Sequence, residues 1–473
     1  MITFNTVRPL IVAVCIAMLS ACGGSAGVNL APDAPENEGN PPAPDNDDGI
    51  GVVGDISDDS QCDVATQNAW AYASMLDFYL FYEQVPIIDP RDFSSADALV
   101  RAVRFQERDD FSRVDDAQQS ALAFDDGREF GLGFRTLFDN DGNPRISLVV
   151  AESPFGLAGV ERGDIIVSVD GLDWSNEALS TGFSDRVLGT PDNPSTATWS
   201  FLKRDTGEAL TVDITATEYS INTVVKAETY PTSSGGTVGY LAFSRFLNTS
   251  ADELITAFDD FRDQNISELV LDLRYNGGGR VSVARLLASL IAGDSNAGKT
   301  IYDYQFNNKY TERDFTLELL GDVGDLNLSR LIVLTTDRSA SASELVIAGL
   351  QPHLDVVTIG SATTGKPYVQ YAYDRCDERL AVIEAEGFNA NGVSVFGGIP
   401  ATCFAEDDPT REFGRSDDGE FEGFLQAGLD FIETGACANA PPVSARSSLN
   451  TTVTDLNGEA RQGMSMDGGT LAN

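Results

Sequence analysis

The sequence predicts a mixed α/β protein with several regions, and three observations support this prediction. The chain has 473 residues, enough for two or three domains and at least one large core. Apolar strands alternate with helical stretches over 222–437, which is typical of an α/β domain with buried, partly parallel strands. Short strands between glycine turns occupy 127–217, and helical spacing dominates 62–123. We therefore expect a small helical N-terminal region, then a β domain, then an α/β core.

The N-terminus is typical of an exported lipoprotein. One positive charge precedes an apolar run that is too short to span a bilayer, and the run ends in Leu-Ser-Ala-Cys. This ending resembles the bacterial lipobox, which predicts removal of residues 1–21 as a signal peptide and acylation of Cys22. Gly23 after the cysteine favours sorting to the outer membrane. We expect a lipid-anchored protein of the cell envelope, on the periplasmic face of the outer membrane rather than the inner one.

Charge and composition limit the partners and mark two unstructured segments. Asp and Glu outnumber Lys and Arg by 73 to 31, so the formal net charge is −42. Such a surface repels phosphate backbones, and we therefore expect no nucleic-acid partner. Residues 22–61 are rich in Pro, Gly, Asn and Asp and predict an acidic disordered tether. Residues 438–473 are rich in Ser, Thr, Asn and Gly and predict a disordered tail.

Helical spacing in the N-terminal region is clearest at 69–82. The β region that follows it carries two glycine motifs. The first motif is a GLGF loop made of Gly131, Leu132, Gly133 and Phe134. In PDZ domains such a loop turns backbone N–H groups toward a peptide's terminal carboxylate, and the peptide adds as a strand. The second, AGVERGDIIVSVDG at 158–171, resembles the helix-to-strand stretch of PDZ domains. We expect a PDZ-like peptide-binding domain over 127–217. The DNDGN run at 139–143 is interpreted as a hairpin turn rather than a calcium loop.

The residues that could act as a general base limit which hydrolytic mechanisms this chain can use. The chain has one histidine, His353, which follows an apparent helix and is expected to be structural. A serine can instead be activated by a lysine whose burial lowers its pKa toward the working pH. The apolar strand RLIVLTT leads into RSASASE, which places Ser341 at a helix N-terminus. A second strand, DVVTIG, leads into TTGKPYVQ, with Lys366 on the turn.

These motifs resemble those of the C-terminal processing peptidases, also called tail-specific proteases. That family joins a PDZ domain to a crotonase-like core of ββα superhelix type and uses a Ser-Lys dyad. The resemblance implies Ser341 as nucleophile, Lys366 as general base, and Gln370 as the residue that orients the amine. The separation of 25 residues between Ser341 and Lys366 fits the family pattern. The resemblance extends from about Cys62 to Cys437.

The same resemblance assigns an oxyanion hole. The stretch LDLRYNGGG is similar to the family's LDLR-x-N-PGG loop, which implies that Gly278 donates one N–H and Ala342 the other. Three positions depart from the family pattern: Gly277 replaces the usual proline, Pro367 follows the lysine, and Thr364 stands where an aromatic residue is common. These departures indicate a divergent branch with its own substrate pocket.

The cysteines predict disulfide bonds rather than a metal site. Once Cys15 is removed with the signal and Cys22 is acylated, four cysteines remain: Cys62, Cys376, Cys403 and Cys437. Four cysteines allow three connectivities, and we expect Cys376–Cys403 together with Cys62–Cys437, which would join the two ends of the folded part. No CxxC pair is present, and we expect no metal and no cofactor.

A Walker-like stretch, GDSNAGKT at 293–300, does not predict nucleotide binding. A phosphate loop follows a strand and precedes a helix, whereas here a helix is expected before the stretch and a strand after it. The function expected from the sequence is a serine endopeptidase that cleaves exported proteins or peptides. Two alternatives stay open: a catalytically silent lipoprotein that binds peptides through its PDZ module, and a crotonase-like hydrolase acting on other substrates.

Overall fold

The computed structural model describes residues 61–174, 182–324, 326–416 and 419–439. The predicted signal peptide, Cys22, almost all of the tether and most of the tail lie outside these residues. No helix within the described part of the chain is both long enough and apolar enough to cross a membrane.

The central element is a six-stranded sheet in the order β12-β13-β14-β17-β18-β21. Its strands are β12 (Val224–Pro231), β13 (Thr237–Phe243), β14 (Glu268–Asp272), β17 (Arg330–Thr335), β18 (Asp355–Gly360) and β21 (Cys403–Phe404). β12 is antiparallel to β13, and the other neighbouring strands are parallel. Their near-continuous apolar sequences fit a parallel sheet that is covered on both faces. The expected partly parallel α/β core is therefore present.

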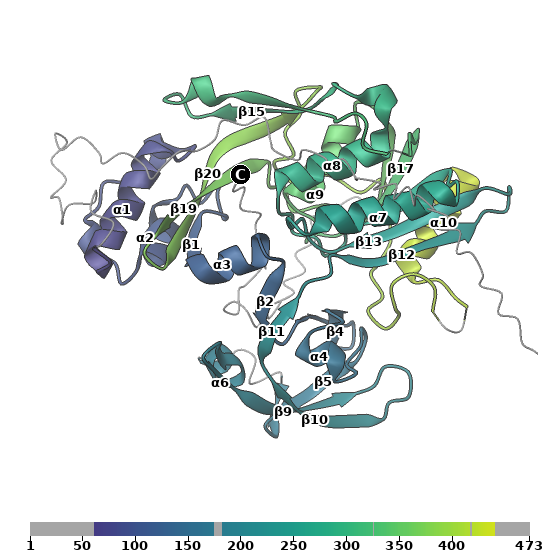
Figure 1. Cartoon of the computed structure of the whole chain (residues 1–473), viewed down its shortest axis with the longest axis horizontal. Helices are drawn as coiled ribbons and strands as arrows, with labels where there is room; N and C mark the ends of the chain where they lie inside the picture. Colours follow the sequence, from purple (N-terminus) through teal and green to yellow (C-terminus); the bar gives the residue numbers. More distant parts are fainter. Residues whose placement is uncertain (1–60, 175–181, 325, 417–418, 440–473) are drawn as a thin grey trace, which may run out of the picture.

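Helices cover both faces of this sheet (Figure 1). They are α7 (Ser250–Asp263), α8 (Val281–Ala292), α9 (Ala342–Leu350) and α10 (Gly423–Thr434). Alternate residues of β14 serve the two layers: Leu269 and Leu271 pack with α7, α8 and α9, whereas Val270 packs with α10. The carboxyl ends of β14, β17 and β18 lie side by side, so the loops that follow them meet at one edge of the sheet.

A second sheet joins the N-terminal region to the core. It consists of β1 (Arg113–Asp116), β15 (Thr300–Phe306), β16 (Phe315–Glu318), β19 (Tyr368–Arg375) and β20 (Glu378–Asn389). β20 pairs with β1, β15 and β19. The short 3-10 helix Asp294–Asn296 lies between α8 and β15, so a helix precedes the Walker-like stretch and a strand follows it, as expected from the sequence.

The N-terminal region is less purely helical than expected. Its α-helices are α1 (Val64–Asp77), α2 (Ala96–Val103) and α3 (Ala117–Phe124), and it has 3-10 turns at Tyr82–Gln84 and Pro90–Asp92. Another 3-10 turn, Thr311–Arg313, lies between β15 and β16 of the second sheet. α1 begins at an N-cap from Asp63 and ends before the helical spacing of the sequence ends. β1 crosses from this region into the second sheet. The apolar residues of α1 and α2 share one continuous cluster with α8, α9 and β20.

The glycine-rich β region is inserted between the N-terminal region and the central sheet. Its strands are β2 (Arg128–Gly131), β3 (Phe134–Phe138), β4 (Pro144–Val149), β5 (Ile165–Val169), β6 (Leu172–Asp173), β7 (Gly189–Thr190), β8 (Asn193–Pro194), β9 (Thr196–Leu202), β10 (Ala209–Thr215) and β11 (Thr217–Ser220), with helices α4 (Pro154–Leu157) and α6 (Phe183–Leu188). The main sheet has the order β10-β9-β5-β4-β3, which leaves β3 at an edge. β2 and β11 pair as the stalk that carries the region (Figure 1). A turn within 139–143 joins β3 to β4, as expected for a hairpin.

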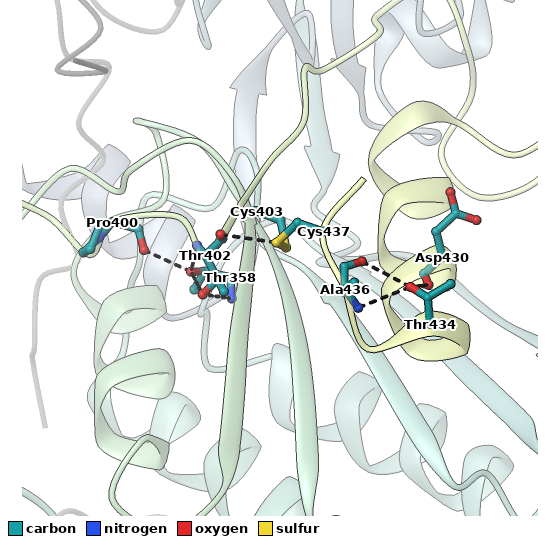
Figure 2. Close-up of a disulfide and its surroundings, with 8 residues drawn as sticks. All are labelled: Thr358, Pro400, Thr402, Cys403, Asp430, Thr434, Ala436 and Cys437. Carbon is teal, nitrogen blue, oxygen red and sulfur yellow. Dashed lines mark hydrogen bonds between the residues drawn. A yellow bond between two sulfur atoms is a disulfide. The ribbon is translucent and has the colours of Figure 1, made fainter. Parts of the chain in front are cut away.

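The expected disulfide pairing is wrong, although the same four cysteines are bonded. Cys62 pairs with Cys376, and Cys403 pairs with Cys437. The first bond fastens the start of the N-terminal region to the turn between β19 and β20. The second fastens the segment after α10 to β21 at the edge of the central sheet (Figure 2). Sequence distance suggested a bond between the chain ends, but the two ends pack on different sheets.

Candidate active site

The candidate site lies where the loops after β14, β17 and β18 converge. Gly278 belongs to the first loop, Ser341 to the second and Lys366 to the third. Since these strands are parallel neighbours, three loops that are distant in sequence reach one place. The sheet therefore brings together the three segments that carry the predicted catalytic motifs.

Ser341 occupies a sharp turn between β17 and α9. Its backbone has φ 54° and ψ −112°, a left-handed conformation that is strained for a residue with a side chain. Ala342 is the first residue of α9, so its N–H has no partner within the helix. The turn thus presents a half-buried serine at the positive end of a helix dipole.

A buried carboxylate ties the serine loop to the lysine loop. Glu344 is completely buried. It accepts hydrogen bonds from the backbone N–H of Ser341 (2.9 Å), the Thr363 hydroxyl (2.5 Å), and the N–H groups of Gly365 (2.6 Å) and Lys366 (2.8 Å). Burial raises the pKa of Glu344 above its usual range, although these four donors favour the ionised form. Glu344 therefore holds the loop that carries Ser341 against the loop that carries Lys366.

Lys366 is buried, and the pKa of its amine lies near neutral pH. Only 1% of the residue is exposed, and its ammonium nitrogen lies 5.1 Å from the centre of the Phe111 ring. Burial, followed by the positive charge of Arg113, lowers the pKa of Lys366 to about 7. Lys366 Nζ donates to Gln370 Oε1, and Gln370 Nε2 in turn donates to the carbonyl oxygen of Phe111 (3.0 Å). At physiological pH a substantial fraction of this amine is neutral.

Ser341 and Lys366 line the same small pocket. Tyr302, Tyr304 and Leu345 form part of its wall. No hydrogen bond joins the Ser341 hydroxyl to the Lys366 amine among the described residues, because the amine is directed to Gln370. Apo active sites often hold catalytic hydrogen bonds long or unformed until substrate binds, so this geometry is compatible with catalysis.

The glycine loop approaches the serine closely. Gly278 has φ 110°, and a Cβ on it would lie 2.9 Å from the Ser341 Cβ and 3.1 Å from the Ala342 nitrogen. Its own N–H donates to Asn276 Oδ1 at 2.9 Å. The Asn276 carbonyl accepts from Ala340 N–H (3.1 Å) and from the Ser343 hydroxyl (2.8 Å). Of the two expected oxyanion donors, Gly278 is thus engaged in this structure, and Ala342 has no acceptor among the described residues.

His353 and the GLGF residues lie away from this pocket. His353 lies in the turn after α9, and its Nε2 is 2.8 Å from the carbonyl oxygen of Thr300. In the GLGF stretch, Gly131 ends β2, Leu132 is buried, and Gly133 and Phe134 line a separate pocket between the β region and the core. A Cβ on Gly133 would lie 2.0 Å from the Ser153 Cβ, so a side chain is excluded there.

Two arginines of the β region contact the loop that carries Gly278. Arg135, in β3, donates to the Tyr275 carbonyl oxygen at 2.6 Å. Arg162 is 5% exposed and donates to the Tyr275 hydroxyl (2.9 Å), to Asp407 Oδ1 (2.7 Å) and to the Ser147 carbonyl oxygen (2.5 Å). Tyr275 directly precedes Asn276, so the β region is in polar contact with the candidate oxyanion loop.

Several residues of the site were not found from the sequence. Glu344 lies inside the RSASASE motif, and its charge three residues after a helix-capping serine was the available signal. Asn276 lies inside the glycine motif. Phe111 and Arg113 come from the N-terminal region, more than 200 residues before Lys366, and no sequence signal connects them to it.

Two stretches of the chain match models of a peptidase family. Residues 237–401 match the model of peptidase family S41, and residues 66–113 match the S41 N-terminal domain. The chain is 27% identical over 285 residues to a chloroplastic carboxyl-terminal-processing peptidase of Arabidopsis thaliana, covering 59% of this chain and 54% of the relative. It is 28% identical to a carboxy-terminal-processing protease of Bartonella bacilliformis, covering 51% of this chain and 52% of the relative. The chain spans about half the length of the curated relatives it matches.

A solved structure extends the likeness over most of the fold. The crystal structure of a Bacteroides fragilis protein described as an S41 protease superposes with a TM-score of 0.62 at 26% identity, covering 78% of this chain and 97% of that one. The S41 match contains Ser341 and Lys366, and the N-terminal match contains Phe111 and Arg113. Over these two stretches the chain is therefore similar to peptidase family S41, and it is related to the carboxyl-terminal-processing proteases.

Proposed function

We propose that this protein is a serine endopeptidase that cleaves exported proteins or peptides with Ser341 as nucleophile and Lys366 as general base. One observation carries the proposal: a fully buried lysine with a pKa of about 7 lines the same pocket as a serine held in a strained turn at a helix N-terminus. Buried amines of this kind are suited to proton transfer near neutral pH.

The proposed reaction uses groups that line the pocket or lie beside it. Neutral Lys366 removes the proton from the Ser341 hydroxyl while the oxygen attacks the peptide carbonyl, and the resulting ammonium protonates the leaving amine. Water then hydrolyses the acyl-enzyme with the lysine again as base. The developing oxyanion is stabilised by Ala342 N–H, and by Gly278 N–H once it is released from Asn276. Gln370 and the Phe111 carbonyl hold the amine between steps.

The β region is proposed to capture substrate as a PDZ-like domain over 127–217. β3 is an edge strand, so one side of its backbone is available for an added peptide strand. Gly133 and Phe134 at its start line a pocket with Arg135, which donates to the Tyr275 carbonyl oxygen and has further N–H groups that suit a terminal carboxylate, and with Arg245, which pairs with Glu129. In this proposal the helical region (62–123) and the peptidase domain (222–437) of crotonase-like type complete the folded part, and a lipid on Cys22 holds it in the cell envelope.

One observation favours the second candidate, a catalytically silent peptide-binding lipoprotein. The Lys366 amine donates to Gln370 rather than to Ser341, and the Gly278 N–H is engaged by Asn276. A silent protein would keep both arrangements permanently. A peptidase would leave them when substrate binds.

The test uses protein lacking residues 1–60, with Ser341→Ala and Lys366→Ala as paired variants and Ser233→Ala, an exposed serine in the turn between β12 and β13, as the control. Each is incubated with casein and with peptides that carry free or amidated C-termini, and the products are identified by mass spectrometry. We expect cleavage by the parent and the control, at least a 10³-fold loss in both dyad variants, and weaker cleavage of amidated peptides. Cleavage that survives Ser341→Ala would show that Ser341 is not the nucleophile. A folded parent that binds peptides without cleaving them between pH 6 and 10 would support the silent candidate.

A further inference from the structure

A buried carboxylate holds the turn that places Phe111 beside Lys366. Asp109 lies between α2 and β1 and is fully buried. Its Oδ1 accepts hydrogen bonds from the backbone N–H groups of Phe111 (2.7 Å) and Ser112 (2.9 Å). The Phe111 carbonyl oxygen accepts from Gln370, and the Phe111 ring lies 5.1 Å from the Lys366 amine. Asp109 therefore holds in place the residue that contacts both the proposed base and its orienting glutamine.

The second oxygen of this carboxylate is also buried. Asp109 Oδ2 makes no hydrogen bond, and no cation forms an ion pair with Asp109, among the residues that the structure describes. The arginines around the turn each pair with another acid: Arg104 with Asp110, Arg108 with Glu386, and Arg113 with Asp115. Buried charges in native proteins are nearly always paired. A partner that becomes charged only during the reaction would account for this arrangement.

The other titratable groups around the turn leave the charge of Asp109 available to Lys366. Burial raises the pKa of Tyr79, and the charge of Asp109 raises it further. Burial also raises the pKa of Tyr368 to about 12, so both phenols are neutral near pH 7. The carboxylate of Glu344 is already engaged by four donors. Burial lowers the pKa of Lys366, and Asp109 is the first of the carboxylates that raise it, ahead of Glu344.

We propose that Asp109 is a positioning residue for the proposed base: it holds the Phe111 turn, and its negative charge stabilises the ammonium form of Lys366 during the reaction. The inference rests on the peptidase function proposed above. The proton passes from the Ser341 hydroxyl to Lys366 Nζ and from there to the leaving amine, while Asp109 takes no proton. A buried ammonium without a counter-charge is costly. A fixed carboxylate nearby lowers that cost without touching the substrate.

The test compares the pH profiles of kcat/KM of the parent, Asp109→Asn and Asp110→Asn, each made in the full chain. Asparagine at 109 keeps an oxygen for the two N–H groups of the turn and removes the charge. The control removes the same charge from an exposed side chain one residue away.

In Asp109→Asn the pKa of Lys366 should fall, so we expect the acid limb to move to lower pH by about half to one unit. Because a weaker base is a poorer catalyst, the rate above pH 9 should fall about two- to threefold. The profiles of the parent and Asp109→Asn should therefore cross, and Asp110→Asn should keep the parent's profile.

The outcomes separate this inference from the proposed function. If the folded parent cleaves no peptide between pH 6 and 10, the peptidase proposal fails, and this inference fails with it. If the parent cleaves and Asp109→Asn keeps its acid limb, the peptidase stands and the role of Asp109 is overturned. A rate that falls equally at every pH also overturns it, because a loosened turn would act in this way. Equal shifts in Asp109→Asn and Asp110→Asn would do the same, since they would reflect overall charge.

A second variant covers a failure of Asp109→Asn to fold. Asp109→Ser keeps a short hydroxyl that can accept from the turn and also removes the charge. The same shift of the acid limb is expected for it. If neither variant folds, Asp109 serves the fold alone and the inference is overturned.

Discussion

The N-terminal region and the inserted β region both contact the peptidase core, but they are attached in different ways. The N-terminal region shares one continuous apolar cluster with α8, α9 and β20, adds β1 to the second sheet, and is fastened by the Cys62–Cys376 bond. The β region keeps its own aromatic core, in which Phe134 stacks on Phe155 with ring centres 4.1 Å apart. Few of its buried apolar side chains pack outside that core: Leu148 joins the cluster beneath α10, and Tyr219 joins a small cluster with Phe124 and Leu247.

This difference has consequences for the site. The N-terminal region supplies Phe111 and Arg113 to the surroundings of Lys366, so the proposed base is in contact with a segment outside the S41 core match. The β region contacts the site less directly: Arg135 and Arg162 donate hydrogen bonds to Tyr275, which lies in the loop that carries Gly278. One region therefore forms part of the candidate site, whereas the other is a module joined to it by polar contacts and a few apolar side chains.

Deleting each region in turn should give the largest effect. In a Cys376→Ser background, removal of residues 61–112 exposes the cluster beneath α1 and α2, and we expect a protein that aggregates or binds a hydrophobic dye. The ends of the β region are adjacent, because Ile221 N–H donates to the Gly127 carbonyl oxygen at 2.8 Å and β2 pairs with β11. Replacing residues 128–220 with a short Gly-Ser linker should therefore leave a soluble protein.

Thermal unfolding followed by circular dichroism checks both deletions. The linker variant should show one cooperative transition, and the N-terminal deletion should show none. A cooperative transition in the N-terminal deletion would mean that this region is also a separable module. Loss of folding in the linker variant alone would reverse the comparison.

Breaking the polar junction of the β region should give a smaller effect. Burial favours the neutral form of Asp407, but Arg162 and Arg274 outweigh it and lower the pKa of Asp407 to about 2. A carboxylate with a lowered pKa stabilises the fold above its unfolded pKa of about 4, and this stability is lost as pH falls toward 2. In Arg162→Met the pKa of Asp407 should rise. We expect the midpoint of acid unfolding to shift up by about half a unit, with a loss of about 3 kcal/mol at neutral pH.

Arg128→Met is the control for this substitution. Arg128 lies in the same region and forms an ion pair with Glu218 in which both side chains are exposed, and exposed pairs contribute about 0–1 kcal/mol. Acid and urea unfolding of both variants measure the difference. Equal midpoints in Arg162→Met and Arg128→Met would show that the junction adds no stability.

The sequence predicted the elements of this comparison better than their attachment. The apolar runs before RSASASE and TTGKPYVQ identified β17 and β18, and parallel pairing then brings Ser341 and Lys366 together. The partner of Cys62, which is Cys376, was predicted wrongly, because sequence separation does not reveal which turn a terminal segment packs against. Phe111 and Arg113 were missed for the same reason: their contact with Lys366 depends on the pairing of β1 with β20. Local patterns reveal local structure, whereas contacts between regions depend on tertiary packing.

The smallest expected effect tests whether the N-terminal region adjusts the catalytic base. The charge of Arg113 disfavours the ammonium form of Lys366, while Asp109, Glu344 and Asp115 favour it. Arg113→Met removes the positive charge from this balance, so the pKa of Lys366 should rise from about 7. Because the neutral amine is the active form, the acid limb of kcat/KM should move to higher pH by about half to one unit.

The full pH profile distinguishes this effect from a structural defect. At pH 7 the variant should cleave several-fold more slowly than the parent, and above pH 9 the two rates should converge, because Lys366 is neutral in both. A merely destabilised variant would be slower at every pH. Arg128→Met should keep the parent's profile, since its guanidinium group lies in the β region and pairs with Glu218. An acid limb that stays at the parent's pH in Arg113→Met would show that burial alone sets the pKa of Lys366, and that the N-terminal region contributes packing but no charge to the base.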